Sequence, residues 1–148
     1  QCLQALSSLY SDLVIHRDVK SEMLFLEWMD LSNRAADFGL CAQMTSEQSK
    51  WSAMAGKAHC TAPEYVNKDT YGTKADIWFL GVVVIEMLQG EPPYSKEIPL
   101  KAGPWISELR GIPKLENPEQ LSAVFQDFLT CWFLTDEDTP WSAEQLLQ

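Results

Sequence analysis

Two aspartates and a lysine have the side chains best suited to catalysis in this 148-residue chain: Asp18, Lys20 and Asp37. A carboxylate can accept a proton or bind a hard cation such as Mg²⁺, and an ammonium group can offset negative charge on a substrate. A lone aspartate is most often a solvated loop residue, so its sequence neighbours must indicate whether it has a catalytic role. These neighbours form motifs in a fixed order: His16-Arg17-Asp18, Asp37-Phe38-Gly39, Ala62-Pro63-Glu64 and Asp76-Ile77-Trp78.

All of these motifs, in this order and spacing, resemble the C-terminal lobe of a eukaryotic protein kinase. Further stretches resemble one serine/threonine kinase family, the p21-activated kinases, along the whole chain: Cys41-Ala42-Gln43, Gly90-Glu91-Pro92-Pro93-Tyr94, Asn117-Pro118-Glu119 and Leu146-Leu147-Gln148. The resemblance implies a mainly α fold, a kinase C-lobe with a small β-hairpin near the catalytic loop. It also implies that the N-lobe, which carries the glycine-rich loop and the strand-borne lysine, is not part of this chain.

The resemblance implies a role for each candidate catalytic and cofactor-binding residue. Asp18 matches the base that accepts the proton of the substrate hydroxyl, and Lys20 matches the lysine that offsets charge on the transferred phosphoryl group. Asp37 matches the aspartate that binds Mg²⁺. Together with Phe38 and Gly39 it would line the site for ATP and Mg²⁺, the cofactors of the family.

Other residues of the motifs match structural positions of the family. Asp76 would accept hydrogen bonds from the backbone of the catalytic loop and hold that loop rigid. His16 would pack beside Phe38 beneath the active-site cleft. Arg17 matches the arginine that pairs with a phosphorylated activation loop, and Glu64 matches a glutamate with a buried arginine partner.

The expected site also departs from the family. Met23 stands where the family has the asparagine that binds the second metal ion, and a thioether is a poor ligand for Mg²⁺. Lys57 replaces a threonine of the peptide-binding floor. Ala53 occupies the position of the activating threonine, so phosphorylation there cannot order the loop through Arg17. Ser52 is the adjacent hydroxyl that could substitute.

Two further departures affect the framework. Pro140 falls where the family has the arginine partner of Glu64, and a buried carboxylate that loses its partner costs about 3–5 kcal/mol. Gly103-Pro104 interrupts a segment that is helical in the family, and proline inside a helix costs about 3 kcal/mol.

Hydrophobic periodicity outlines the elements that must position these residues. The resemblance implies one partial kinase domain over residues 1–148, with a catalytic loop at 14–26, an irregular activation segment at 37–64, a central buried helix at 76–88 and C-terminal helices within 105–148. The apolar pattern is consistent with the buried helix. Asp76 is the expected N-cap of the central helix, and Gly90 follows its end. Further predicted elements are helices at 1–10, 121–129 and 142–148, and strands at 14–15, 24–26 and 33–36.

Composition excludes several classes of function. Eleven Lys and Arg against 21 Asp and Glu give a net charge of −10, which argues against nucleic-acid binding. None of the cysteines forms a C-x-x-C pair, so a zinc site is not expected. The longest apolar run, residues 77–85, is far shorter than the roughly 20 residues of a membrane span. Reduced cysteines and no recognisable targeting segment indicate the cytoplasm. The chain begins at Gln1, so we do not expect this to be the natural start.

Three functions follow as alternatives. The resemblance predicts an ATP-dependent serine/threonine kinase that is inactive as a C-lobe fragment, or that keeps residual activity within a longer ATP-binding kinase. A non-catalytic pseudokinase module would instead bind a protein partner through the face left by the missing N-lobe. Changes at metal, switch and floor positions also allow a degenerate copy with little function.

Overall fold

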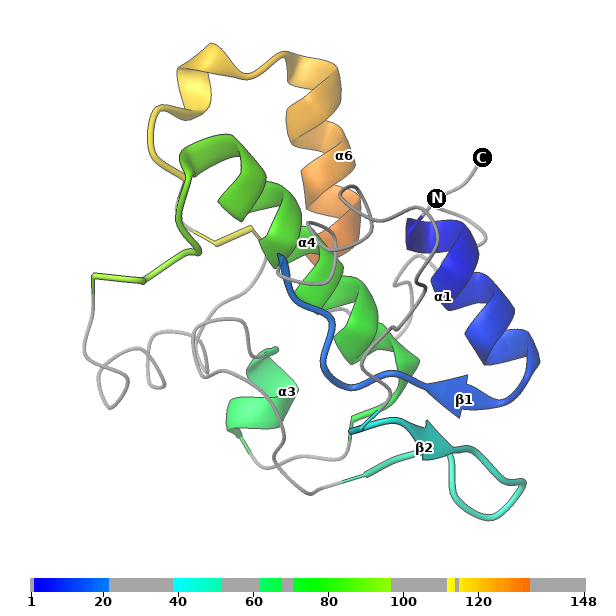
Figure 1. Ribbon diagram of the computed structural model, residues 1–148. Helices are drawn as coiled ribbons and strands as arrows, with labels where there is room; N and C mark the ends of the chain where they lie inside the picture. Colours follow the sequence, from blue (N-terminus) through cyan, green and yellow to red (C-terminus); the bar gives the residue numbers. More distant parts are fainter. Residues whose placement is uncertain are drawn as a thin grey trace, which may run out of the picture.

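The described residues form a helical protein with one small sheet (Figure 1). A computed structural model of the chain describes residues 2–21, 39–51, 62–67, 71–96, 112–113 and 115–133. The elements in chain order are α1 (Cys2–Ser11), β1 (Val14–Ile15), β2 (Ala42–Gln43), α3 (Pro63–Val66), α4 (Thr73–Gln89), the 3₁₀ helix η2 (Pro118–Gln120) and α6 (Ala123–Phe133). The helices predicted at 1–10 and 121–129 are confirmed as α1 and α6. The expected elements at 24–26, 33–36 and 142–148 lie outside the described residues.

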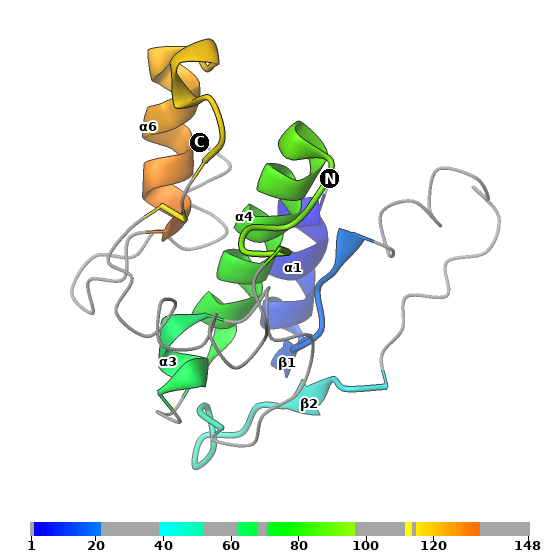
Figure 2. The ribbon, with the colours of Figure 1, turned by 90° about the vertical axis from the view of Figure 1, so that its left-hand side faces the viewer.

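Helix α4 is the centre of the fold. It lies between α1 and α6 and contacts both of them (Figures 1 and 2). Its side chains from Ala75 to Val83 are buried without a break, which explains why its sequence is apolar on every side. The helix ends at Gly90, whose φ of 81° is left-handed and whose N–H donates to the carbonyl of Glu86.

The start of α4 differs from the sequence-based prediction. The helix begins at Thr73, and Gly72 rather than Asp76 is its N-cap residue. Asp76 lies in the first turn of the helix, and its carboxylate binds backbone N–H groups of another segment. The prediction of Asp76 as N-cap was therefore wrong, because the carboxylate serves a long-range contact instead of its own helix end.

Helix α6 packs against α4 through aromatic rings. Trp78 and Phe133 meet edge to face, with ring centroids 4.8 Å apart and an interplanar angle of 85°. Ser122 immediately precedes α6, and its hydroxyl accepts a hydrogen bond from the N–H of Phe125 at 3.2 Å. The predicted helix at 121–129 thus begins two residues later than expected, after its capping serine, and continues to Phe133.

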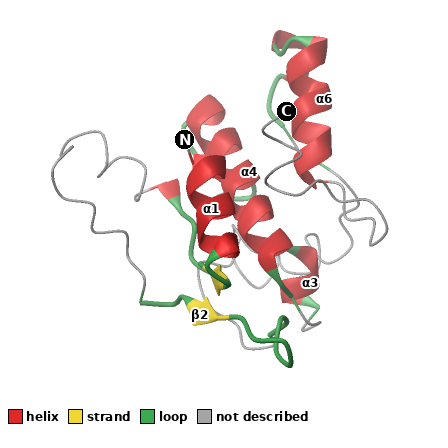
Figure 3. Ribbon diagram, turned by 90° about the vertical axis from the view of Figure 1, so that its right-hand side faces the viewer, coloured by secondary structure: helices red, strands yellow, loops and turns green. Residues whose placement is uncertain are grey.

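The sheet joins two segments that are distant in sequence. β1 and β2 pair antiparallel, with Val14 opposite Gln43 and Ile15 opposite Ala42. The predicted strand at 14–15 is confirmed, but the activation segment is not irregular throughout, because β2 lies within it. The N–H of Met44 extends the pairing by donating to the carbonyl of Leu13 at 2.6 Å. Figure 3 shows this sheet beneath α1 and α4.

None of the helices in the described part of the chain is long and apolar enough to cross a membrane.

Gly81 lets α4 and α6 approach closely, and its replacement tests this packing. A Cβ at position 81 would lie 2.7 Å from Cζ of Phe133 and 3.1 Å from Cε3 of Trp132. Phe133 is fully buried, so its ring cannot swing into solvent. We expect Gly81→Ala to lower the free energy of unfolding by up to about 2 kcal/mol, because overpacking costs about 1–3 kcal/mol and the higher helix propensity of alanine returns about 1 kcal/mol.

Thermal unfolding followed by near-UV circular dichroism measures this effect, since aromatic rings form the contact. Phe133→Leu provides the matched control, because it removes the ring atoms that clash. In the Phe133→Leu background, Gly81→Ala should cost less than it does in the parent chain. A higher melting temperature for Gly81→Ala alone would contradict the close packing.

Candidate active site

The carboxylate of Asp76 anchors the loop that follows β1. Its Oδ2 accepts a hydrogen bond from the backbone N–H of His16 at 2.8 Å, and its Oδ1 accepts one from the N–H of Arg17 at 2.7 Å. Asp76 is completely buried. Two amide donors aimed at one buried carboxylate fix the position of the loop backbone relative to α4.

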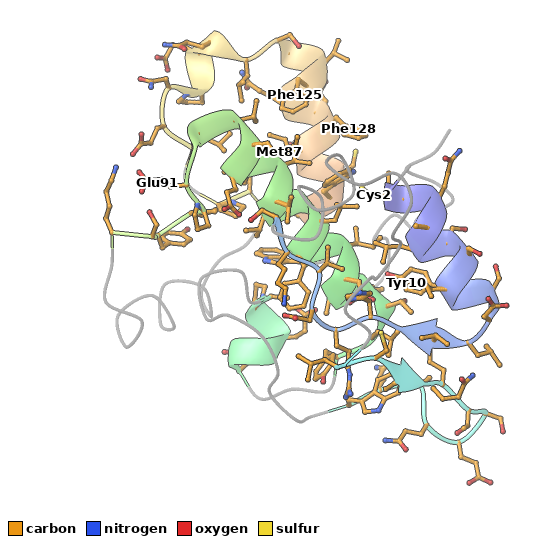
Figure 4. All side chains as sticks on the ribbon, viewed as in Figure 1. Cys2, Tyr10, Met87, Glu91, Phe125 and Phe128 are labelled. Atoms are coloured by element: carbon orange, nitrogen blue, oxygen red, sulfur yellow. The ribbon has the colours of Figure 1, made fainter. Side chains whose placement is uncertain are left out.

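Tyr10 supplies a third donor to the same carboxylate. Its hydroxyl lies 3.3 Å from Oδ2 of Asp76 and 3.1 Å from the carbonyl oxygen of Thr73. Figure 4 shows Tyr10 near the end of α1, on the side that faces the start of α4. Helix α1, the loop and α4 therefore meet at Asp76.

The ionisation of these groups reflects their burial. Loss of hydration raises the pKa of Asp76 to about 6, although the N–H groups of His16 and Arg17 and the hydroxyl of Tyr10 act in the opposite direction. Burial, and then the nearby carboxylate of Asp76, raise the pKa of Tyr10 well above its usual value, so Tyr10 keeps its proton and donates it.

Arg17 has a strained backbone that this anchor maintains. Its φ is 68°, in the left-handed region where a non-glycine residue costs roughly 1–2 kcal/mol. The bond from its N–H to Asp76 holds the residue in this conformation. The turn redirects the chain immediately before Asp18, and so determines where the Asp18 side chain can lie.

Asp18 and Lys20 form an ion pair on this loop. Lys20 Nζ lies 2.6 Å from Oδ2 of Asp18, and the exposed fractions of the two side chains are 25% and 13%. The N–H of Asp18 lies 3.3 Å from Nδ1 of His16, which accepts its hydrogen bond. A partly shielded carboxylate beside an ammonium group can accept a proton from a hydroxyl while the cation offsets charge on a neighbouring phosphoryl oxygen.

The guanidinium group of Arg17 joins the loop to the segment that contains β2. Its Nε donates to the carbonyl oxygen of Leu40 at 2.5 Å, and its Cζ lies 5.9 Å from the centroid of the Trp51 ring. Trp51 in turn pairs with Tyr71, which directly precedes the N-cap of α4. None of these contacts was part of the sequence-based prediction.

The remaining predicted site residues are only partly within the described structure. Gly39 lies at the edge of the described residues, in an exposed turn, and Glu64 lies in the first turn of α3. Asp37, Phe38, Met23, Lys57 and Pro140 lie outside the described residues. Within the described ranges, no group of three or more His, Cys, Asp or Glu side chains could hold a metal ion.

Sequence reasoning missed Tyr10, Leu40, Trp51 and Tyr71. Tyr10 carried a weak signal, since its position on the predicted helix at 1–10 marked it only as a possible core residue. Leu40 acts through its carbonyl group, which every residue has, so its side-chain type gave no signal. Trp51 is a large aromatic residue in a polar segment, and that contrast could have singled it out.

Asp76→Asn tests the anchor. The amide can accept a hydrogen bond from one of the two loop N–H groups, but its own NH₂ group would face the other. We expect the free energy of unfolding at pH 7 to fall by about 2 kcal/mol, the cost of a buried donor without an acceptor. Urea unfolding of the two proteins measures the difference.

The pH dependence of that difference follows from the pKa of Asp76. Because the pKa is about 6 in the folded protein and has an ordinary value of 3.8, the folded state binds more protons between these pH values. The part of its stability contribution that depends on protonation is complete below the ordinary pKa and is lost as the pH rises to about 6, while the contribution of the hydrogen bonds to the loop remains. The stability difference between the parent chain and Asp76→Asn should therefore narrow over this range. If the difference in free energy of unfolding between the two proteins stayed constant with pH, the raised pKa of Asp76 would be contradicted.

Tyr10→Phe is the matched control for the anchor. It removes the hydroxyl but leaves both backbone donors, so we expect a smaller loss of about 1 kcal/mol. Because the hydroxyl lowers the pKa of Asp76, the pH-dependent fall in stability should shift to higher pH in this variant.

The geometry can now be compared with known proteins. The family model of the protein kinase domain matches residues 1–148. The chain is 51% identical over 148 residues to serine/threonine-protein kinase PAK 1 of Mus musculus, and covers 27% of that protein. It is 43% identical over 148 residues to serine/threonine-protein kinase pakA of Talaromyces marneffei, and covers 23% of it.

A third relative gives the same result. The chain is 42% identical over 147 residues to serine/threonine-protein kinase pak-1 of Caenorhabditis elegans, and covers 25% of it. All three matches span essentially the whole chain but only about a quarter of the relatives' own length. The resemblance to p21-activated kinases is confirmed, and the chain belongs to the protein kinase family.

Proposed function

We propose that these 148 residues are the helical C-terminal lobe of a serine/threonine kinase domain similar to the p21-activated kinases, and that they transfer no phosphate on their own. The observation that carries the proposal is the Asp18–Lys20 pair, 2.6 Å apart, on a loop that Asp76 anchors. The pair supports assignment of the loop as a kinase catalytic loop, because it joins a carboxylate that could accept a hydroxyl proton to a cation that could offset phosphoryl charge. The absence of transfer is argued from residue types elsewhere in the chain.

The chemistry proposed for this loop is limited to what its own side chains can do. Asp18 would accept the proton of the substrate hydroxyl, and Lys20 would offset charge on the transferred group. The anchor keeps both side chains in place, and such positioning supplies most of the catalysis in phosphoryl transfer.

Residue types elsewhere in the chain support the absence of transfer. ATP and Mg²⁺ are the cofactors of the family, and Asp37 is the proposed ligand for one metal ion. Met23 occupies the position of a second ligand, where a thioether does not suit Mg²⁺. By the same resemblance, Lys57 stands where the family has a threonine of the peptide-binding floor, so a cation replaces a hydroxyl at that sequence position. The donor set therefore does not fit the two-metal site of the family.

A kinase assay tests this proposal. We expect phosphate transfer from Mg-ATP to a basic peptide to be no faster with the parent chain than with Asp18→Asn, because the metal and floor positions are altered. Near-UV circular dichroism on the same samples establishes that both proteins are folded. Transfer that Asp18→Asn abolishes would instead support the alternative of residual kinase activity.

A non-catalytic interaction module is the second candidate. It is favoured by the contrast between a complete anchor at Asp76 and substituted residues at Met23, Ala53 and Lys57. The proposed partner is a kinase N-lobe, bound on the face that this lobe would cover. Titration of the chain with the N-lobe of a p21-activated kinase, followed by calorimetry, should give saturable binding. If the measured heats equal the heats of dilution, the chain does not bind the N-lobe and the interaction-module function is ruled out.

A further inference from the structure

The guanidinium group of Arg17 has two partners on the segment that contains β2, one on each side of that strand in the sequence. Its Nε donates to the carbonyl oxygen of Leu40, which precedes β2, and its Cζ lies 5.9 Å from the ring of Trp51, which follows β2. The backbone of Arg17 is fixed by Asp76, with an N–H to Oδ1 distance of 2.7 Å. The arginine therefore connects α4, through its backbone, to this segment, through its side chain.

Trp51 is held in place independently of its ring. Its N–H donates to the carbonyl of Tyr71 at 2.9 Å, and the N–H of Tyr71 donates back to Trp51 at 2.8 Å. Tyr71 is 2% exposed and belongs to the hydrophobic core. The two rings lie 6.5 Å apart. The indole ring is thus presented to Arg17 by backbone bonds to a buried neighbour.

The distance of 5.9 Å between the guanidinium carbon and the ring centroid is within reach of a cation–π interaction. An aromatic face attracts the cation without carrying a charge of its own. The contact therefore gives Arg17 a partner that needs no modification of the chain. The nearby position 53 is alanine, which has no hydroxyl to phosphorylate.

We propose that Trp51 is a positioning residue that takes the place of an activating phosphate, so that Arg17 holds residues 39–51 against the catalytic loop in the unmodified chain. The proposal rests on the proposed function only in identifying the Arg17 loop as a catalytic loop. In this arrangement the segment keeps its position whenever the chain is folded. A segment held by a phosphate would take up that position only after phosphorylation.

Hydrogen exchange of the full chain, without nucleotide or peptide, tests the proposal. Two amides report on the segment: Met44, which donates to Leu13, and Trp51, which donates to Tyr71. In Trp51→Ala we expect protection of the Met44 amide to fall about two- to fivefold, the range for a partly exposed cation–π contact. Trp51→Phe should recover most of that protection, because an aromatic face remains.

Leu40→Ala is the matched control. It truncates a half-exposed side chain but keeps the carbonyl that accepts the Arg17 bond, so protection should stay at the parent level. Amides within α4 should exchange at the same rate in all variants, which separates a local effect from global unfolding.

Two results would overturn the proposal. One is equal protection of the Met44 amide in Trp51→Ala and Leu40→Ala. The other is loss of that protection in the parent chain after phosphatase treatment, which would show that a phosphate holds the segment. Because the assay contains no nucleotide or peptide, its outcome is independent of whether the chain transfers phosphate.

Discussion

A single buried carboxylate organises the described part of this protein. Asp76 accepts hydrogen bonds from two consecutive backbone amides and a tyrosine hydroxyl, which come from a loop and from α1. An ionised carboxylate without partners would be several kcal/mol too costly at such a depth. The three donors offset part of that cost, since burial still raises the pKa of Asp76 to about 6. The position of the loop, the strained turn at Arg17 and the docking of α1 therefore depend on one another.

The groups that form the framework of the site, Asp76 and its hydrogen-bond donors, are different from the side chains of the proposed chemistry, Asp18 and Lys20. The contacts of Asp76 stabilise the fold whether or not phosphate is transferred, because they bind backbone groups and not a substrate. Asp18 and Lys20 occupy a position that the framework gives them, and neither contacts the buried anchor through its side chain. The anchor is therefore built from groups that are separate from the side chains of the proposed chemistry.

Sequence reasoning was most successful where a pattern is local. The periodicity of α1, the continuous apolar stretch of α4 and the short strand before His16 all follow from side chains close in sequence. The pairing of β1 with β2 could not be predicted in this way, because each strand has only two residues and neither has a distinctive sequence pattern. The same limit explains Tyr10, which lies 66 residues from Asp76. Spacing indicated only a helix cap for Asp76, whereas its hydrogen bonds to the loop backbone were expected from the family resemblance and not from any local pattern.

The contact between Arg17 and Trp51 shows a further consequence of residue type. A charged partner for an arginine can be added and removed, which makes the attached segment a switch. An aromatic partner is present whenever the chain is folded, and its attraction changes little with modification state or salt. Ala53, next but one to Trp51, has no hydroxyl to phosphorylate, whereas the Trp51 ring is available to Arg17 whenever the chain is folded. In the proposed arrangement, the position of residues 39–51 depends on the fold alone and is coupled through Arg17 to the carboxylate that anchors the loop after β1.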